Sequence, residues 1–298
     1  MSRLLAFLGG HATWVLFVGV FLGLALPSLS TLARPLLAPA VAVLLTATLV
    51  RIDWRFMLNH LRRPWSAAVI IIWLLIGAPL ATAGVLALLP LPTSLTTALV
   101  LMAAAPPILS AAPIAMMLGL DGALALVVGL IATLLTPLTV PPLALALLGL
   151  ELDIGITEFM VRLAVVVAIA LAAALVIRRA IGRERLPRLS RHLDGLVVVV
   201  MLVFAVAIMD GVTATLAERP TTVALWLLAA FVANPALQIA GALAFAWLGQ
   251  RRALTVGLVS GNCNMGLLLA AFPPDTDTDV VLYFAVAQLP MYMLPALL

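Results

Sequence analysis

The sequence predicts an all-α polytopic membrane protein of ten transmembrane helices, arranged as two inverted five-helix repeats within one domain, residues 1–298. Of the 298 residues, 65% are hydrophobic and only 9% are charged, with a mean hydropathy of +1.27. A water-exposed surface does not tolerate that composition. A helix needs about 20 mostly apolar residues to cross the bilayer. Ten such windows are present, at 12–30, 34–51, 66–90, 95–118, 122–149, 158–178, 195–214, 221–249, 253–271 and 278–297.

The repeat appears when the two halves of the chain are compared at a shift of 156 residues. Arg63-Pro64 before the third window corresponds to Arg219-Pro220 before the eighth, and Pro79 corresponds to Pro235. Repeat one covers about 12–149 and repeat two about 158–297. Five spans per repeat is an odd number, so the two repeats must have opposite topology. Such inverted repeats are typical of secondary transporters that work by alternating access.

Charge gives the expected orientation. The 16 basic residues are all arginine and 12 acidic residues oppose them, for a net charge of +4. The arginines lie in short loops between apolar windows, which favours a role in membrane orientation and excludes nucleic-acid binding. With the N-terminus inside, most arginines face the cytoplasm. We therefore expect a multi-pass protein of the bacterial inner membrane with both termini cytoplasmic. Residues expected on that side are Arg3, Arg51, Arg55, Arg62, Arg63, Arg178, Arg179, Arg183, Arg185, Arg188, Arg191, Arg251 and Arg252.

Helix breakers occur at corresponding places in the fourth and ninth windows. The fourth contains three prolines within eight residues, and the ninth contains glycines and amides, which are costly to place in lipid. Paired interrupted helices form the substrate site in inverted-repeat transporters. The candidate substrate-binding residues are therefore Pro106, Pro107, Ser110, Pro113, Ser260, Asn262, Cys263 and Asn264.

Four further polar residues are candidates for a cavity or for ion coupling. Asp210 is a candidate coupling carboxylate, although its repeat counterpart Asp53 favours an interfacial position. Asn234, Gln238 and Gln288 either line a cavity or bond between helices. The single cysteine and the interfacial or loop positions of the three histidines indicate neither a metal site nor a cofactor site. The chain is therefore not expected to be an enzyme.

The chain resembles the bile acid:sodium symporter family over essentially its whole length. The matching features are the Arg63-Pro64 start, the Ala105-Pro106 break with Asp121 fifteen residues after Pro106, the tract Gly261–Leu267 and the run Leu282–Pro290. The resemblance implies a panel domain of spans 1, 2, 6 and 7. It also implies a core of spans 3, 4, 5, 8, 9 and 10, with spans 4 and 9 crossed at the midplane, and transport of organic anions.

The sodium ligands of that family do not carry over. Its Ser-Asn pair falls on Ala111 and Ala112, and its helix 9 glutamate falls on Val259. Its remaining ligands fall on Leu74, Ala125, Gly129 and Cys263. Only the asparagine at Asn264 is kept. Because a buried sodium ion needs about five or six oxygen ligands, we expect sodium coupling to be weak or absent.

Other interpretations remain. The chain could be a sodium- or proton-coupled symporter using backbone ligands, a non-transporting membrane sensor, or a relative of auxin-efflux and malate permeases. An arsenite carrier is disfavoured, because Ile108, Leu109 and Ser110 stand where that family has a cysteine. The expected partners are the lipid bilayer and a small solute, either an organic anion or a weakly polar, partly apolar compound. The oligomeric state is open.

Overall fold

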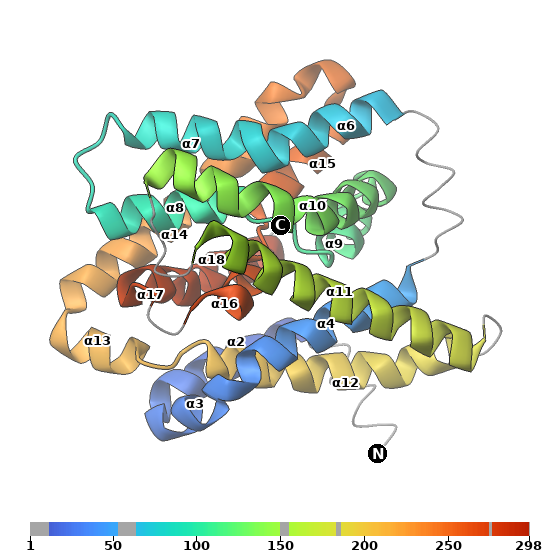
Figure 1. Cartoon of the computed structure of the whole chain (residues 1–298), viewed down its shortest axis with the longest axis horizontal. Helices are drawn as coiled ribbons and strands as arrows, with labels where there is room; N and C mark the ends of the chain where they lie inside the picture. The colour runs from blue at the N-terminus through green and yellow to red at the C-terminus, as the bar shows by residue number, and fades with distance from the viewer. Residues whose placement is uncertain (1–11, 53–63, 150–154, 183–185, 274–275, 298) are drawn as a thin grey trace. The chain divides into compact units, whose positions relative to one another are not determined.

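A computed structural model describes residues 12–52, 64–149, 155–182, 186–273 and 276–297. Within these ranges the chain forms helices and no strand (Figure 1). It divides into two compact units, the first formed by Met1–Ile52 and Val165–Ala224 and the second by Asp53–Ala164 and Leu225–Leu298. Several residues used for the predicted orientation and repeat lie outside the described residues, namely Arg3, Asp53, Arg55, Arg62, Arg63, Arg183 and Arg185.

The first unit contains α2 (Ala12–Ala25), α3 (Pro27–Ala33), the 3₁₀ turn η1 (Arg34–Leu36), α4 (Leu37–Arg51), α12 (Leu186–Ala207) and α13 (Val212–Glu218). It also takes in the second part of α11 (Ile156–Ile181) and the start of α14 (Pro220–Ala244). We predicted the first break at residues 30–34, but helix α2 ends earlier. Leu26 has φ −124° and ψ 76°, because the residue before a proline avoids helical geometry and Pro27 has no N–H to donate.

Helix α12 packs against α2, α3 and α4 in this unit. Two glycines of α2 make the approach close. A Cβ on Gly19 would lie 2.8 Å from Ala205 Cβ, and one on Gly23 would lie 2.8 Å from Met209 Cβ. In lipid, helices associate through van der Waals contacts because no hydrophobic effect drives them together, and small residues let the two backbones come close enough to make those contacts.

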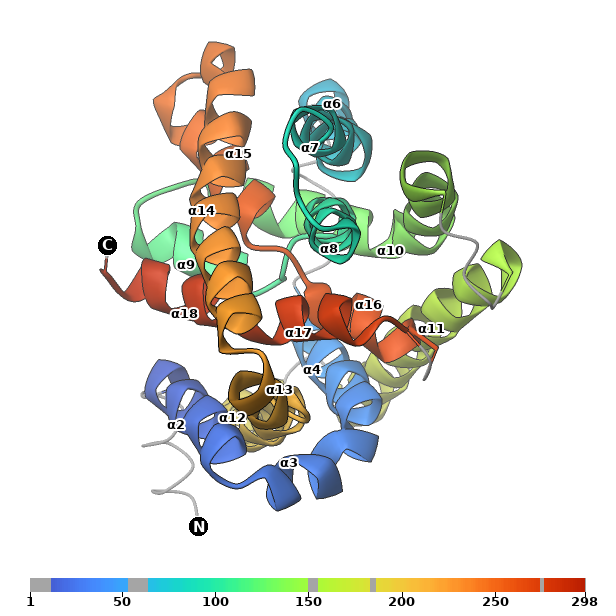
Figure 2. The same ribbon diagram turned by 90° about the vertical axis from the view of Figure 1, so that its left-hand side faces the viewer.

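The second unit contains α6 (Pro64–Ile72), the π turn η2 (Trp73–Gly77), α7 (Ala78–Leu86), α8 (Thr93–Ala104), α9 (Ala111–Met117) and α10 (Gly122–Leu148). Its C-terminal part contains the rest of α14, η3 (Ala246–Leu248), α15 (Gln250–Gly261), α16 (Met265–Ala271), α17 (Thr278–Val286) and α18 (Gln288–Leu297). Helices α6 and α7 follow one direction through the π turn (Figure 1), and the view turned by 90° shows both of them nearly end-on (Figure 2). Pro79 explains the turn, since its missing N–H leaves the carbonyl of Leu75 without its helical donor.

The tenth predicted window is not one helix. It divides into α17 and α18 at Ala287. Pro290 lies four residues after Val286 and cannot donate to its carbonyl, so the helical ladder is interrupted there. By contrast, α10 stays continuous although it contains Pro137, Pro141 and Pro142.

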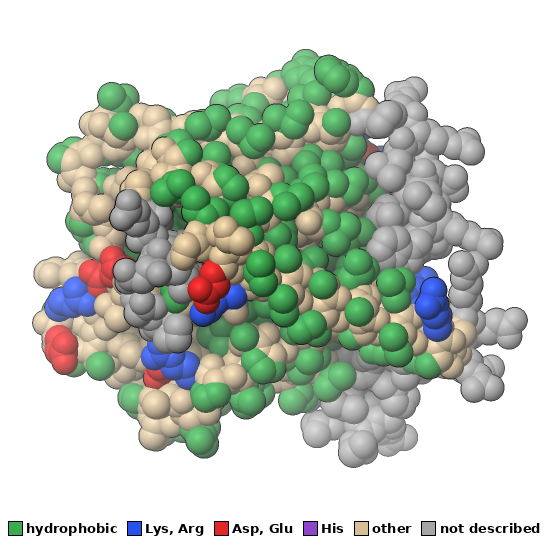
Figure 3. Space-filling model, in the orientation of Figure 1, with side chains coloured by type: hydrophobic (Ala, Val, Ile, Leu, Met, Phe, Trp, Pro, Cys, Tyr) green, Lys and Arg blue, Asp and Glu red, His purple; other side chains and the backbone are tan. Residues whose placement is uncertain are grey.

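Six helical stretches among the described residues are long and apolar enough to cross a membrane. They are Pro27–Arg51, Trp65–Leu86, Gly122–Leu148, Ile156–Ile181, Gly195–Glu218 and Pro220–Ala244. Shorter apolar stretches are helix α8 and Thr278–Met291, which joins α17 to the start of α18. Hydrophobic side chains cover the visible faces of α7 and α11, while the charged groups in that view lie near helix ends (Figure 3). The chain therefore has the helices of a helical membrane protein.

Candidate functional site

Helix α8 ends at Ala104, and the chain does not become helical again until α9 begins at Ala111. Ala105 is extended, with φ −66° and ψ 141°. The break follows from Pro106 and Pro107, because neither can donate to a carbonyl of the preceding turn. Two consecutive prolines thus leave a short stretch of non-helical backbone inside an apolar window.

Helix α15 ends at Gly261, and α16 begins at Met265. No proline causes this second break. Asn264 caps α16 through its side chain, because its Oδ1 accepts a hydrogen bond from the backbone N–H of Leu267 at 3.2 Å. Asparagine side chains favour helix starts because they replace a missing backbone acceptor. The amide-rich tract therefore ends one helix and starts the next.

The two breaks are joined by a pair of antiparallel backbone hydrogen bonds. Ile108 N–H donates to the Asn262 carbonyl at 2.8 Å, and Asn264 N–H donates to the Pro106 carbonyl at 2.6 Å. Pro107 and Cys263 stand directly opposite each other between these bonds. In this arrangement the central residues donate no N–H to the opposite segment, so Pro107 lies where a donor is not required. The backbone groups freed by one break therefore partner those freed by the other.

Helix α14 supports the second break through two amide side chains. Gln238 Nε2 donates to Asn234 Oδ1 at 2.7 Å, and Asn234 Nδ2 donates to the Gly261 carbonyl at 2.8 Å. Gly261 permits this approach, because a Cβ there would lie 2.7 Å from the Asn234 carbonyl oxygen. Asn234 is 2% exposed, so the relay sits in a dry environment where its bonds are strong.

Trp73 belongs to this site although the sequence did not point to it. Its indole Nε1–H donates to Ser260 Oγ at 3.1 Å, and Ser260 Oγ donates to the Val256 carbonyl at 2.8 Å. The π turn begins at Trp73. A tryptophan in an apolar window needs a partner for its N–H, and π turns often occur at functional positions. Those two signals could have identified Trp73, but not its partner.

The side chain of Asn262 is fully buried. Its Nδ2 donates to the Leu258 carbonyl at 2.8 Å, whereas its Oδ1 has no partner. Among the described residues, this oxygen is the one buried side-chain polar atom left without a hydrogen bond. If the amide of Asn262 were rotated by 180°, its Oδ1 would lie about 2.8 Å from the Leu258 carbonyl oxygen and the two acceptors would repel each other. The hydrogen bond from Nδ2 therefore fixes the orientation of the amide. An unpartnered buried acceptor costs about 1–3 kcal/mol and calls for an explanation.

The predicted site residues divide into two groups. Most of them meet at the paired breaks or in the support behind them, namely Pro106, Pro107, Ser260, Asn262, Cys263, Asn264, Asn234 and Gln238. Ser110 and Pro113 are exposed, at the cap and in the first turn of α9. Gln288 donates to the Phe284 carbonyl of its neighbouring turn at 3.1 Å.

Asp210 lies in the other unit, in the turn between α12 and α13. Its Oδ2 is 2.9 Å from Arg34 Nη1, and its Oδ1 accepts a hydrogen bond from Thr31 at 2.7 Å. Its side chain is 13% exposed and that of Arg34 is 61% exposed. The carboxylate therefore already has a counter-charge and a second donor.

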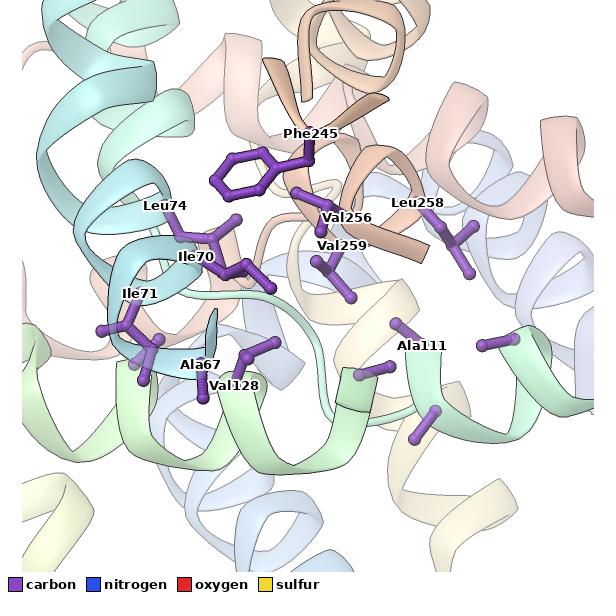
Figure 4. Packing of buried hydrophobic residues seen from close by; sticks show 14 of the residues in the cluster. Ala67, Ile70, Ile71, Leu74, Ala111, Val128, Phe245, Val256, Leu258 and Val259 are labelled. Carbon is purple, nitrogen blue, oxygen red and sulfur yellow. The ribbon is translucent and has the colours of Figure 1, made fainter. Parts of the chain in front are cut away.

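Five of the positions matched to sodium ligands lie in one apolar cluster of the second unit. Leu74, Ala111, Ala112, Ala125 and Val259 are all at most 5% exposed and pack with Val128 and Val256 (Figure 4). None of these side chains offers an oxygen. Within the part of the chain that the structure describes, no group of three or more His, Cys, Asp or Glu side chains could hold a metal ion. These five side chains therefore cannot ligate a sodium ion.

A scan against protein-family models and a search of curated proteins found no match for this chain. Its function must therefore be inferred from the geometry of the paired breaks. That geometry offers buried backbone, four amide side chains and an apolar surround in one place. It offers hydrogen-bonding groups in an apolar surround, the combination that small-molecule sites use.

Proposed function

We propose that this protein is a secondary transporter that moves a small organic solute by alternating access. The pairing of the two helix breaks carries the proposal. Irregular backbone at membrane depth is tolerated only where it is buried in protein or lines a cavity. In transporters such backbone forms the substrate site. Here it lies in a chain rich in apolar helices, where Ile108 and Asn264 donate across the break.

The proposal includes ten spans and an inverted repeat. Adding the shift of 156 to the break at 105–110 gives 261–266, and the second break lies at 262–264. The same shift relates Pro79, beside the π turn, to Pro235 within α14. Corresponding interruptions in the two halves support a repeat, because repeated units place their breakers at the same internal position.

The proposal also includes a panel and a core. The first unit contains the predicted panel spans 1, 2 and 7 and most of span 6, and the second contains core spans 3, 4, 5, 9 and 10 and most of span 8. The paired breaks belong wholly to the second unit. In alternating access, one bundle moves against another around a fixed site. Because both breaks belong to one unit, their pairing would be kept while the two bundles move.

We propose that transport does not depend on sodium. The five side chains at the matched positions support this, since all belong to one buried apolar cluster; they are Leu74, Ala111, Ala112, Ala125 and Val259. Burying a cation there would remove its water without replacing the lost oxygen ligands, which is expensive. Any coupling would have to use another ion, or the carrier would be uncoupled.

For orientation, we propose that both termini are cytoplasmic. Arg51 ends α4, and Arg178, near the end of α11, donates to the Val50 and Ile52 carbonyls at 2.5 and 2.7 Å. These two arginine-bearing helix ends therefore lie side by side, which supports a common cytoplasmic face. A C-terminal fusion to alkaline phosphatase should be inactive, while a fusion to green fluorescent protein should fluoresce. The reverse pattern would contradict the orientation.

The decisive experiment is uptake into proteoliposomes. Vesicles containing the protein are given a mixture of organic acids, alcohols and amides, and the internal solutes are measured by mass spectrometry. We expect selective uptake of at least one solute, abolished by Asn234→Leu and kept by Gln288→Met. Replacing sodium with choline should leave the rate unchanged. No uptake above protein-free vesicles would refute transport, and a large loss of rate in choline would refute sodium independence.

A further inference from the structure

We infer that Asn262 is the specificity-determining residue of the transport site, and that it selects solutes carrying a neutral hydrogen-bond donor, a hydroxyl or an amide N–H, attached to an apolar body. This inference rests on the proposed function. It deepens that function by naming the feature of the solute that the protein reads.

The first support is the unused oxygen of Asn262. The residue is 0% exposed, and its Oδ1 is without a partner while its Nδ2 is held on the Leu258 carbonyl. The Nδ2 bond fixes the amide, so the oxygen cannot turn away to find a donor elsewhere. The Leu258 carbonyl already accepts the backbone N–H of Asn262 at 3.2 Å, so it does not depend on the side chain. The side-chain amide of Asn262 therefore contributes little to the stability of the fold, and its Oδ1 is left to accept a hydrogen bond from a solute.

The second support is the position of Asn262 at the paired breaks. Its own carbonyl accepts from Ile108, and its neighbour Cys263 faces Pro107. Next along the chain, Asn264 caps α16 through Oδ1 and is only partly buried. The Oδ1 of Asn264 must face the Leu267 N–H, because rotating the amide by 180° would place its NH2 group against that N–H. The Nδ2 of Asn264 therefore points away from the cap and remains available as a donor. A solute reaching this place could thus both donate to Asn262 and accept from Asn264.

The third support is the absence of charge in the two broken segments. Residues 103–113 and 258–267 contain no acidic or basic side chain. An ionised carboxylate cannot donate to Asn262, and without a counter-charge its burial would be costly. A neutral donor satisfies the orphaned oxygen at no such cost. A site built to bond a donor rejects analogues that lack one strongly, because its own polar group then stays unpaired.

The test uses three matched probes: phenylacetamide, N,N-dimethylphenylacetamide, which lacks the donor, and phenylacetate, which is ionised at pH 8. Binding to purified protein is followed by thermal unfolding, since a bound solute raises Tm by mass action. We expect phenylacetamide to bind at least tenfold more tightly than the other two. Asn262→Leu, which keeps the branching of the side chain, should remove that preference and weaken phenylacetamide about tenfold, the equivalent of one buried hydrogen bond.

Gln288→Met is the control. Gln288 also donates to the carbonyl four residues earlier and is 2% exposed, but it leaves no buried oxygen unpartnered. It should bind the probes as the wild type does. Without solute, Asn262→Leu should unfold at the same or a higher temperature than the wild type. A marked fall in its Tm would mean that an ordered water already serves the oxygen, and would overturn the inference.

Other outcomes separate the inference from the proposed function. Equal or tighter binding of phenylacetate, failure of phenylacetamide to bind at millimolar concentration, or unchanged selectivity in Asn262→Leu would each overturn the role of Asn262. Proteoliposome uptake of other solutes would still stand in those cases. If no solute enters the vesicles, the transport proposal itself fails.

Discussion

Gly261→Ala tests whether α14 and α15 are held together as tightly as the structure indicates. The added methyl carbon would lie 2.7 Å from the Asn234 carbonyl oxygen and against the Gln238 side chain. Gln238 can rotate, but the carbonyl belongs to the backbone of α14. That helix must therefore retreat by roughly 0.7 Å, the shortfall from an ordinary contact of 3.4 Å, and a retreat also stretches the 2.8 Å bond from Asn234 Nδ2.

The expected loss has two parts. Overpacking of this kind costs about 1–3 kcal/mol. The weakened hydrogen bond adds about 1 kcal/mol. A total of about 2–4 kcal/mol corresponds to a Tm lower by about 5–10 °C for a chain of this size. Thermal unfolding of the detergent-purified protein, followed by the loss of the monodisperse chromatographic peak, measures this directly.

Gly84→Ala is the matched control. Gly84 lies inside α7, and a Cβ there would meet no atom within 4 Å. Alanine is favoured over glycine in a helix interior by about 0.5–1 kcal/mol, so this variant should unfold at or slightly above the wild-type temperature. If Gly261→Ala unfolds within about 1 °C of Gly84→Ala, the close packing of α14 on α15 is wrong.

Three further predictions follow from contacts outside that interface. The losses of unfolding free energy caused by Trp73→Phe and Ser260→Ala should not add up in the double mutant, and a double-mutant cycle should give a coupling of about 1 kcal/mol. Strict additivity would show that the hydrogen bond from the indole contributes nothing to stability. Asp210→Asn should lower stability by less than about 1 kcal/mol, because Arg34 is 61% exposed. The ratio of its solute uptake at pH 6 to that at pH 8 should equal the wild-type ratio, and a changed ratio would indicate a coupling role. Arg178→Gln removes the donor to two carbonyls at the end of α4 and should cost about 1.5–3 kcal/mol, measured by thermal unfolding, with no change contradicting the cap.

The two helix breaks could be predicted because their causes are local. Pro106 and Pro107 lack the N–H that a helix requires, whatever surrounds them. The tract around Asn262 and Asn264 combines glycine with amides, which favour helix ends over helix interiors. The break in the tenth window also has a local cause, Pro290, but the periodic apolar residues on both sides outweighed that signal.

The partners of the site residues could not be predicted. Whether Asn234 bonds a neighbouring helix or lines a cavity depends on the rotation of α14, which one sequence does not specify. The bond from Trp73 to Ser260 joins residues far apart in the chain, and it requires the π turn to aim the indole. The unpartnered oxygen of Asn262 could be predicted least of all, because finding it requires the positions of all the surrounding donors.

The paired backbone bonds have a consequence for biosynthesis. Ile108 and the carbonyl that it serves, on Asn262, are about 150 residues apart in the chain. At about 5–20 residues per second, the ribosome finishes the first break roughly 10–30 s before its partner exists. A nascent chain that stops before Asn262 therefore contains exposed peptide groups that lipid cannot accommodate. The first half must be sheltered by the insertion machinery until the second half arrives, so truncation after α10 should yield a product that is degraded instead of a stable half-protein.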